Sequence, residues 1–84
     1  MEILFSETSK KQLKKLNPLY EQKILLNLEK FKNNIPIDIK KLKNREDEFR
    51  IRVGNYRIQL KKIEEGFLVT KVGKRENFYL AFLL

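Results

Sequence analysis

A strict alternation of apolar and basic residues, interrupted once by a turn, is the strongest structural signal in this sequence. In Phe49–Val53 and again in Tyr56–Lys61, every second residue is apolar, and a period of two is that of a β-strand with one buried face. Gly54-Asn55 separates the two segments and suits a two-residue hairpin turn, in which glycine adopts a positive φ. The sequence therefore predicts a β-hairpin whose register is set by this turn.

The hairpin register sorts the side chains onto two faces. The apolar residues pair with one another on a face that can pack against helices: Val53 with Tyr56, Ile51 with Ile58, and Phe49 with Leu60. On the other face Arg52 lies directly opposite Arg57, and Arg50 lies opposite Gln59. Like charges directly opposed destabilise a strand pair, and the planar guanidinium suits bidentate contacts with phosphate. This pattern favours a phosphate-binding face; the alternative is an ordinary solvated face that glutamates partly neutralise.

The residues before the hairpin have the spacing of helices. Glu2–Phe5 is a short strand candidate, and Ser6 is a good helix N-cap. A weak helical pattern over 7–16 ends at Asn17-Pro18, which cap and begin a second helix over 19–32. The second helix has an apolar stripe formed by Tyr20, Ile24, Leu28 and Phe31, which Leu25 widens. These segments predict an αα-hairpin with one apolar face.

The remaining segments complete the expected sheet. Residues 35–45 contain Pro36 and several lysines and are predicted to be an irregular basic loop. Phe67–Val72, after a second turn at Glu65-Gly66, is apolar on both faces over most of its length and is predicted to lie in the middle of the sheet. The expected fold class is α+β, with an N-terminal strand, an αα-hairpin and a three-stranded antiparallel meander, the helices packing on one sheet face.

The absence of two residue types limits the chemistry. The chain has no His and no Cys, which excludes imidazole catalysis, thiolate nucleophiles, disulfides and metal sites built from these ligands. We expect neither a cofactor nor a metal, and any catalysis must use Lys, Arg, Tyr, Glu or Asp. Lys and Arg number 19 against 11 Asp and Glu, a formal net charge of +8. This excess suits a polyanionic partner such as nucleic acid, or an acidic protein.

Length and hydropathy bound the organisation of the chain. Its 84 residues leave room for one small domain, spanning 1–84. No apolar run reaches the roughly 18 residues of a membrane span, and Met1–Phe5 has no signal-peptide layout. We expect a cytoplasmic protein that does not enter a membrane.

Two segments resemble the RelE/ParE superfamily of toxin–antitoxin toxins. Residues 49–58, Phe-Arg-Ile-Arg-Val-Gly-Asn-Tyr-Arg-Ile, are similar to the basic hairpin of that family, and Val72–Glu76 is similar to its later strand, which ends in glycine and two basic residues. The resemblance implies a RelE-like fold. RelE-like members are ribosome-dependent, metal-free endoribonucleases that cut mRNA by attack of a 2′-hydroxyl on the adjacent phosphate. ParE-like members share the fold and inhibit DNA gyrase.

The resemblance also implies catalytic roles for residues of the hairpin. Arg50 and Arg52 match the basic strand residues of the family, one of which assists deprotonation of the 2′-hydroxyl. Arg57 matches the arginine that contacts the scissile phosphate. Because arginine is a poor base at neutral pH, the identity of the general base stays open, and Glu48 on the same face is a second candidate.

Further roles follow for the residues after the last predicted strand. Arg75 matches the basic residue that stabilises the transition state or protonates the leaving oxygen, and Lys74 precedes it in a basic pair that binds substrate. Tyr79 is the nearest match to a tyrosine on which a nucleotide base stacks. The alternative for Tyr79 is packing within the apolar tail around it.

Three functions are compatible with this resemblance. The leading hypothesis is an mRNA-cleaving toxin whose partners are the ribosome, mRNA and a RelB-like antitoxin. The second is a ParE-like gyrase inhibitor without catalysis, and the third is a degenerate relative that binds its antitoxin but has lost activity. Leu13 and Leu16 of the first helix are candidates for antitoxin binding, and the alternative for each is plain core packing.

Overall fold

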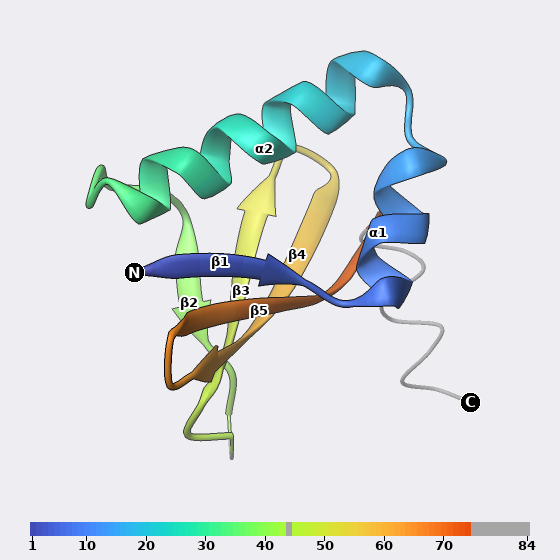
Figure 1. Ribbon diagram of the computed structural model, residues 1–84. Coiled ribbons are helices and arrows are strands. Elements are labelled where there is room, and N and C mark those ends of the chain that lie inside the picture. Colours follow the sequence, from blue (N-terminus) through green and yellow to red (C-terminus); the bar gives the residue numbers. More distant parts are fainter. Residues whose placement is uncertain (44, 75–84) are drawn as a thin grey trace.

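One sheet and two helices make up the part of the chain that the structure, a computed structural model, describes: residues 1–43 and 45–74 (Figure 1). In chain order the elements are β1 (Glu2–Phe5), α1 (Glu7–Lys14), α2 (Pro18–Lys32), β2 (Ile39–Lys41), β3 (Glu48–Val53), β4 (Tyr56–Ile63) and β5 (Gly66–Lys74). The strand order in the sheet is β1-β5-β4-β3-β2. Strand β1 runs parallel to β5, and all other neighbours are antiparallel. The α+β class and the order of elements expected from the sequence are confirmed.

Both helices begin where the capping residues predicted. The Ser6 side chain accepts a hydrogen bond from the Ser9 amide at 3.1 Å, and the Asn17 side chain accepts one from the Leu19 amide at 3.0 Å. Pro18 is the first residue of α2, where its missing N–H costs nothing. In the described part of the chain, neither helix combines the length and apolar character that crossing a membrane requires.

The β3–β4 hairpin has the predicted register. Val53 pairs with Tyr56 across Gly54-Asn55, and the φ of Gly54 is 58°, which is the conformation that a two-residue turn requires of its first residue. Because side chains alternate between faces along a strand, this pairing fixes which side chains of the hairpin face the helices and which face away.

Strand β2 lies where the sequence predicted an irregular loop. It pairs antiparallel with β3 and places Lys40 opposite Arg50. The backbone pairing extends to Asp38, whose carbonyl accepts a hydrogen bond from the Arg52 amide at 2.9 Å. The loop prediction was wrong for this segment because β2 has only three residues and depends on the hydrogen-bonding groups that the edge of β3 offers. The predicted meander therefore gains a fourth antiparallel strand.

Strand β5 lies between β1 and β4, in the interior of the sheet as predicted. The first residue of β5, Gly66, is placed so close to β1 that a Cβ atom there would overlap the backbone of Glu2, so the two strands approach only because this residue is glycine. The connection from β1 to α1 is also held to β5, because the Ser6 hydroxyl donates to the Thr70 carbonyl, 64 residues away along the chain.

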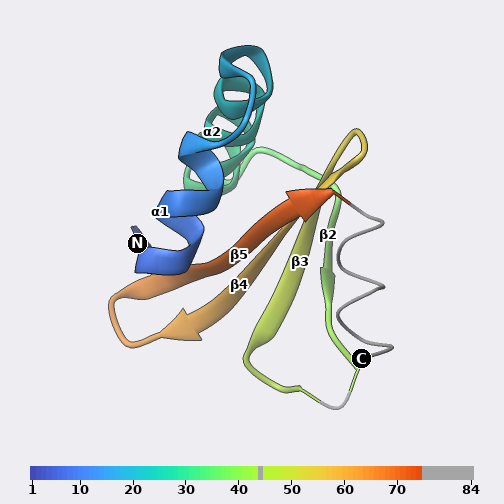
Figure 2. The same cartoon turned by 90° about the vertical axis from the view of Figure 1, so that its right-hand side faces the viewer.

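The hydrophobic core lies between the helices and one face of the sheet (Figure 2). Its fully or nearly buried members come from both helices and from β3, β4 and β5: Leu13, Ile24, Leu28, Ile51, Tyr56, Ile58, Leu60, Val69 and Val72. The β3 and β4 residues in this set belong to the face predicted to cover helices. The alternate residues of these two strands belong to the opposite face.

Candidate nucleic-acid interface

The name basic face is used here for five of the cationic residues on the sheet face opposite the helices: Lys40, Arg50, Arg52, Arg57 and Lys71. Strand pairing places Lys40 opposite Arg50 and Arg52 opposite Arg57, while Lys71 lies opposite Gln59. Residues directly opposed in antiparallel strands have Cβ atoms roughly 4.5–5.5 Å apart. The sheet therefore holds cations from four neighbouring strands close together, and the register predicted for its three arginines is confirmed.

The three arginines differ in exposure. Arg52 is exposed, the side chain of Arg50 retains 19% of its accessible surface, and Arg57 retains 6%. The Nε atom of Arg50 is buried and has no hydrogen-bond acceptor within residues 1–43 and 45–74. A buried donor without an acceptor lowers the stability of the fold, and an anion bound here would satisfy it.

Two carboxylates lie on the same side of the sheet as the basic face, at its opposite ends. The Asp38 Oδ1 atom is 3.8 Å from Arg50 Nη2. The Glu48 Oε2 atom accepts a hydrogen bond of 2.7 Å from Arg45 Nη1, and the Glu48 side chain is only 16% exposed. Glu48 is thus engaged by an arginine outside the basic face, and the cations of the face outnumber the two carboxylates beside it.

The predicted residues beyond the hairpin are placed only in part. Lys74, the last residue of β5, is exposed and lines a hollow of 440 Å³ together with Lys71 and Tyr56. Arg75 and Tyr79 lie outside the described residues, so their roles in catalysis and base stacking stay predictions.

The two leucines predicted to bind an antitoxin have different surroundings. Leu13 is 8% exposed and belongs to the core. Leu16 is half-buried and lines the same hollow as Lys74. Of the two, Leu16 has the more accessible side chain.

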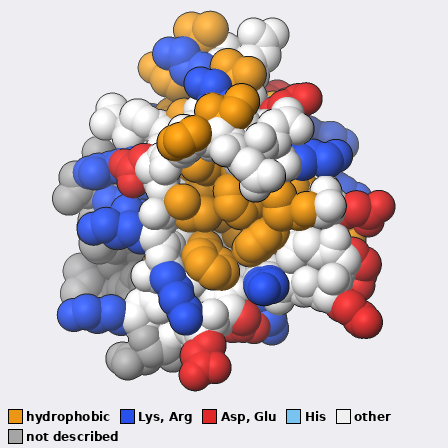
Figure 3. All heavy atoms as spheres, turned by 90° about the vertical axis from the view of Figure 1, so that its left-hand side faces the viewer, with side chains coloured by type: hydrophobic (Ala, Val, Ile, Leu, Met, Phe, Trp, Pro, Cys, Tyr) orange, Lys and Arg blue, Asp and Glu red, His pale blue; other side chains and the backbone are white. Residues whose placement is uncertain are grey.

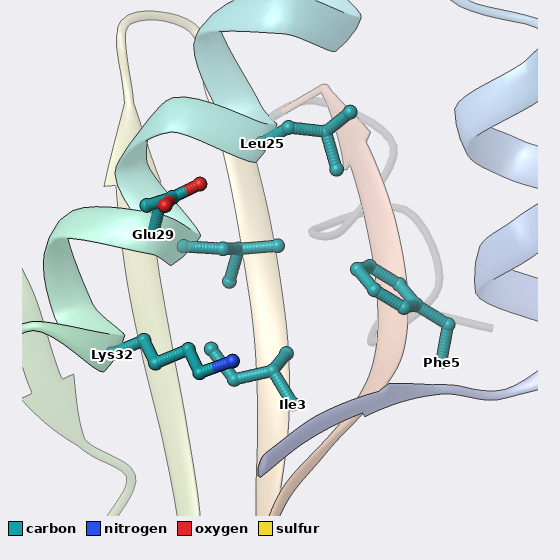
Figure 4. Close-up of a pocket in the computed structure, with 6 residues that line it drawn as sticks. Ile3, Phe5, Leu25, Glu29 and Lys32 are labelled. Carbon is teal, nitrogen blue, oxygen red and sulfur yellow. The ribbon is translucent and has the colours of Figure 1, made fainter. Parts of the chain in front are cut away.

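An apolar hollow of 350 Å³ lies between α2 and β1. It is visible as the apolar patch in the centre of Figure 3. Figure 4 shows Phe5 of β1 extending toward Leu25 of α2, and Ile3 of β1 near the end of the Lys32 side chain. The complete lining is Ile3, Phe5, Leu25, Leu28, Glu29 and Lys32. Leu25, which widens the apolar stripe of the helix, is 41% exposed and forms part of the wall of this hollow.

No site role was expected of Asp38, Lys40 or Lys71. A signal for the first two was present, because Ile35, Ile37 and Ile39 alternate with other residues at the spacing of a strand. Pro36 in the same segment favoured a loop instead. Lys71 belongs to a strand with apolar residues on both faces, where periodicity alone does not show which side a lysine takes.

Similarity to known toxins covers nearly the whole chain. Residues 3–79 match the family model of the ParE toxin of the type II toxin–antitoxin system parDE. The chain belongs to the RelE/ParE superfamily of toxins. This toxin is similar to Toxin RelE3 of Methanocaldococcus jannaschii, with 33% identity over an alignment of 84 positions that covers 94% of this chain and 96% of that protein.

Solved structures agree with this assignment. The toxin is similar to a chain in the crystal structure of the RelB–RelE antitoxin–toxin complex from Methanococcus jannaschii, with a TM-score of 0.82 and 34% identity, covering 94% of this chain and 98% of that one. The isolated E. coli RelE toxin shares the fold, with a TM-score of 0.73 at 22% identity and coverage of 98% and 97%. The family predicted from the basic hairpin is confirmed.

Proposed function

We propose that this toxin is a ribosome-dependent endoribonuclease that cleaves mRNA by attack of a 2′-hydroxyl on the adjacent phosphate. The observation that carries this proposal is the basic face, and above all the pairing of Arg52 directly opposite Arg57. Two like charges in this position weaken the hairpin. Their presence is explained if the two arginines bind an anion. A phosphate between the two strands neutralises both.

The proposed mechanism needs positioning and cations rather than a metal. Arg52 and Arg57 hold the scissile phosphate and stabilise the charge of the pentacoordinate transition state. Arg50, whose Nε donor has no acceptor among the residues that the structure describes, holds a neighbouring phosphate oxygen. Arg75 supplies further cationic stabilisation or protonates the leaving oxygen, and Tyr79 stacks on a base. The site of action is the cytoplasm, where the ribosome and mRNA are found.

A second candidate is inhibition of DNA gyrase, which the match to the ParE toxin model favours. In that case the basic face binds an acidic surface or DNA and carries out no cleavage. A relative without activity that only binds its antitoxin is the third possibility.

Induced expression followed by mapping of mRNA 5′ ends separates these functions. The informative variants are Arg57→Ala and Arg52→Ala; because Arg57 is buried and Arg52 is exposed, loss of cutting in the Arg52 variant is not explained by unfolding. Cuts within translated reading frames that appear with wild type and disappear in both variants support the nuclease. Growth arrest with intact mRNA supports gyrase, and no arrest supports the inactive relative.

We also propose that a RelB-like antitoxin covers this toxin, since the similar archaeal structure is a RelB–RelE complex. Leu16 and the apolar hollow between α2 and β1 offer surface for such a partner, and Leu13 supports α1 from the core. Rim residues Glu29 and Lys32 can pair with charges on a bound amphipathic segment.

A matched pair of variants on α2 tests the hollow as the antitoxin surface. Leu25 lines the hollow and is 41% exposed, whereas its neighbour Leu26 is 55% exposed and is not part of the lining. We expect Leu25→Lys to weaken antitoxin binding about tenfold or more, because it places a charge in an apolar contact, and Leu26→Lys to change it little. Titration calorimetry with the cognate antitoxin measures both, and equal effects would assign the contact to another surface.

A further inference from the structure

One carboxylate stands directly beside the arginines proposed to bind the scissile phosphate. Strand pairing continues past β2, so that Asp38 follows in register opposite Arg52, and its carbonyl accepts the Arg52 amide hydrogen bond at 2.9 Å. The Asp38 carboxylate lies 3.8 Å from the Arg50 guanidinium, and its side chain is 52% exposed. Its position is thus fixed by the sheet, while its oxygens remain accessible.

The other described groups near the basic face are less suited to accept a proton. A guanidinium has no lone pair that can accept a proton, and a protonated lysine has none either. Glu48, the second carboxylate on this side of the sheet, accepts a hydrogen bond of 2.7 Å from Arg45 and is mostly buried. Gln59 carries an amide, which is not basic.

We infer that Asp38 is the general base that deprotonates the attacking 2′-hydroxyl. This inference rests on the proposed nuclease function and assigns the one role that the arginines cannot fill. Asp38 takes the proton, the 2′-oxygen forms a bond to the adjacent phosphorus, and the bond from phosphorus to the 5′-oxygen breaks. The electron pair of that bond goes to the 5′-oxygen, which takes a proton from water or a cationic side chain. The products are a 2′,3′-cyclic phosphate and a 5′-hydroxyl, and Asp38 returns its proton to water.

Three cationic side chains lie around Asp38. Arg50 and Arg52 face it from β3, and Lys40 is the next residue on the same side of its own chain. What the sheet supplies is position, beside the cations that hold the phosphate.

The structure offers a closely matched control for a test. Asp47 is also 52% exposed and also lies near a cation, with its Oδ2 atom 3.9 Å from Lys61 Nζ, but it precedes β3 at the end of the strand remote from the Arg52–Arg57 pair. Asp38→Asn and Asp47→Asn remove the same charge from the same kind of side chain. The readouts are the single-turnover rate of cleavage of mRNA on purified, programmed ribosomes at saturation and, separately, the affinity of the toxin for those ribosomes.

We expect Asp38→Asn to slow cleavage by about 100-fold or more and to leave the affinity for programmed ribosomes nearly unchanged. Asp47→Asn should stay within about twofold of wild type, and Asp38→Glu should recover part of the rate. Asp38→Asn with wild-type rates would overturn the assignment. So would an Asp38→Asn change that slows cleavage no further once Arg50 has been replaced by Ala, because this result indicates that Asp38 acts only through Arg50. If wild type itself leaves the mRNA intact, the proposed nuclease function fails, and the role of Asp38 fails with it.

Discussion

The two faces of the β3–β4 hairpin share one backbone and differ in almost everything else. On the helix side Ile51, Ile58 and Leu60 are completely buried. On the other side Arg52 and Arg57 stand directly opposed, an arrangement that weakens strand pairing. Alternate residues of each strand lie on the two faces. Burial of the apolar face can therefore stabilise the hairpin enough to outweigh the repulsion between the arginines on the opposite face. The residues that stabilise the fold and those proposed to act on RNA thus alternate along the same strands.

The largest effect is expected on the apolar face. Ile58→Ala removes a fully buried side chain from the centre of the sheet and should cost about 2–5 kcal/mol of unfolding free energy, a large part of the stability of a small domain. Urea denaturation measures this loss. The milder Ile58→Val should cost about 0.5–1.5 kcal/mol, and equal losses in the two variants would contradict tight packing at this position.

A smaller effect distinguishes the two sides of β2. Lys40 belongs to the basic face, whereas the next residue, Lys41, pairs with the apolar Phe49 and takes the other side. If the basic face binds RNA as proposed, Lys40→Ala removes one phosphate contact. It should then weaken binding to programmed ribosomes by about 1 kcal/mol, a factor of about five, and reduce the salt dependence of log K by about one unit of slope.

Lys41→Ala removes the same charge and serves as the control for bulk electrostatics. Its binding affinity, measured at several salt concentrations, should remain close to that of wild type. Equal losses in the two variants would show that total charge, and not the basic face, determines the affinity.

The smallest effect has the opposite sign. Arg52→Thr relieves the repulsion with Arg57 and places a good strand former on the hairpin, so it should raise the unfolding free energy by about 0.2–1 kcal/mol while abolishing toxicity. Arg50→Thr should not stabilise, because Arg50 lies opposite Gln59 and approaches Asp38. Urea denaturation at low and high salt checks both, and a stability gain for Arg52→Thr that is insensitive to salt would contradict the electrostatic explanation.

The hairpin could be predicted from the sequence because all the information that determines it is local. Gly54-Asn55 fixes the turn, and the alternation on either side fixes the faces, so the amino-acid pattern alone pairs Arg52 with Arg57 correctly. The caps at Ser6 and Asn17 are local in the same sense. The family resemblance depended on this hairpin and was confirmed with it.

Strand β2 and the placement of Asp38 were not predictable in this way. Ile39–Lys41 becomes a strand only because β3 offers it an edge, and the proximity of Asp38 to Arg50 depends on that pairing. The number of residues in the intervening loop does not reveal the register. The exposure of Leu25 was also not predictable, because an apolar stripe on a helix does not show how far the elements packed against that helix extend.

The parallel pairing of β1 with β5 has a consequence for the order in which parts of the toxin fold. Strand β1 is made first, yet the strand it pairs with begins at Gly66, and loop closure over such a separation slows folding. The β3–β4 hairpin, by contrast, can form as soon as its own residues have been synthesised. During translation the β3–β4 hairpin with its arginines can therefore form before β5, the partner strand of β1, has been synthesised. An antitoxin that recognises β1 and α2 together would bind only after the sheet is complete.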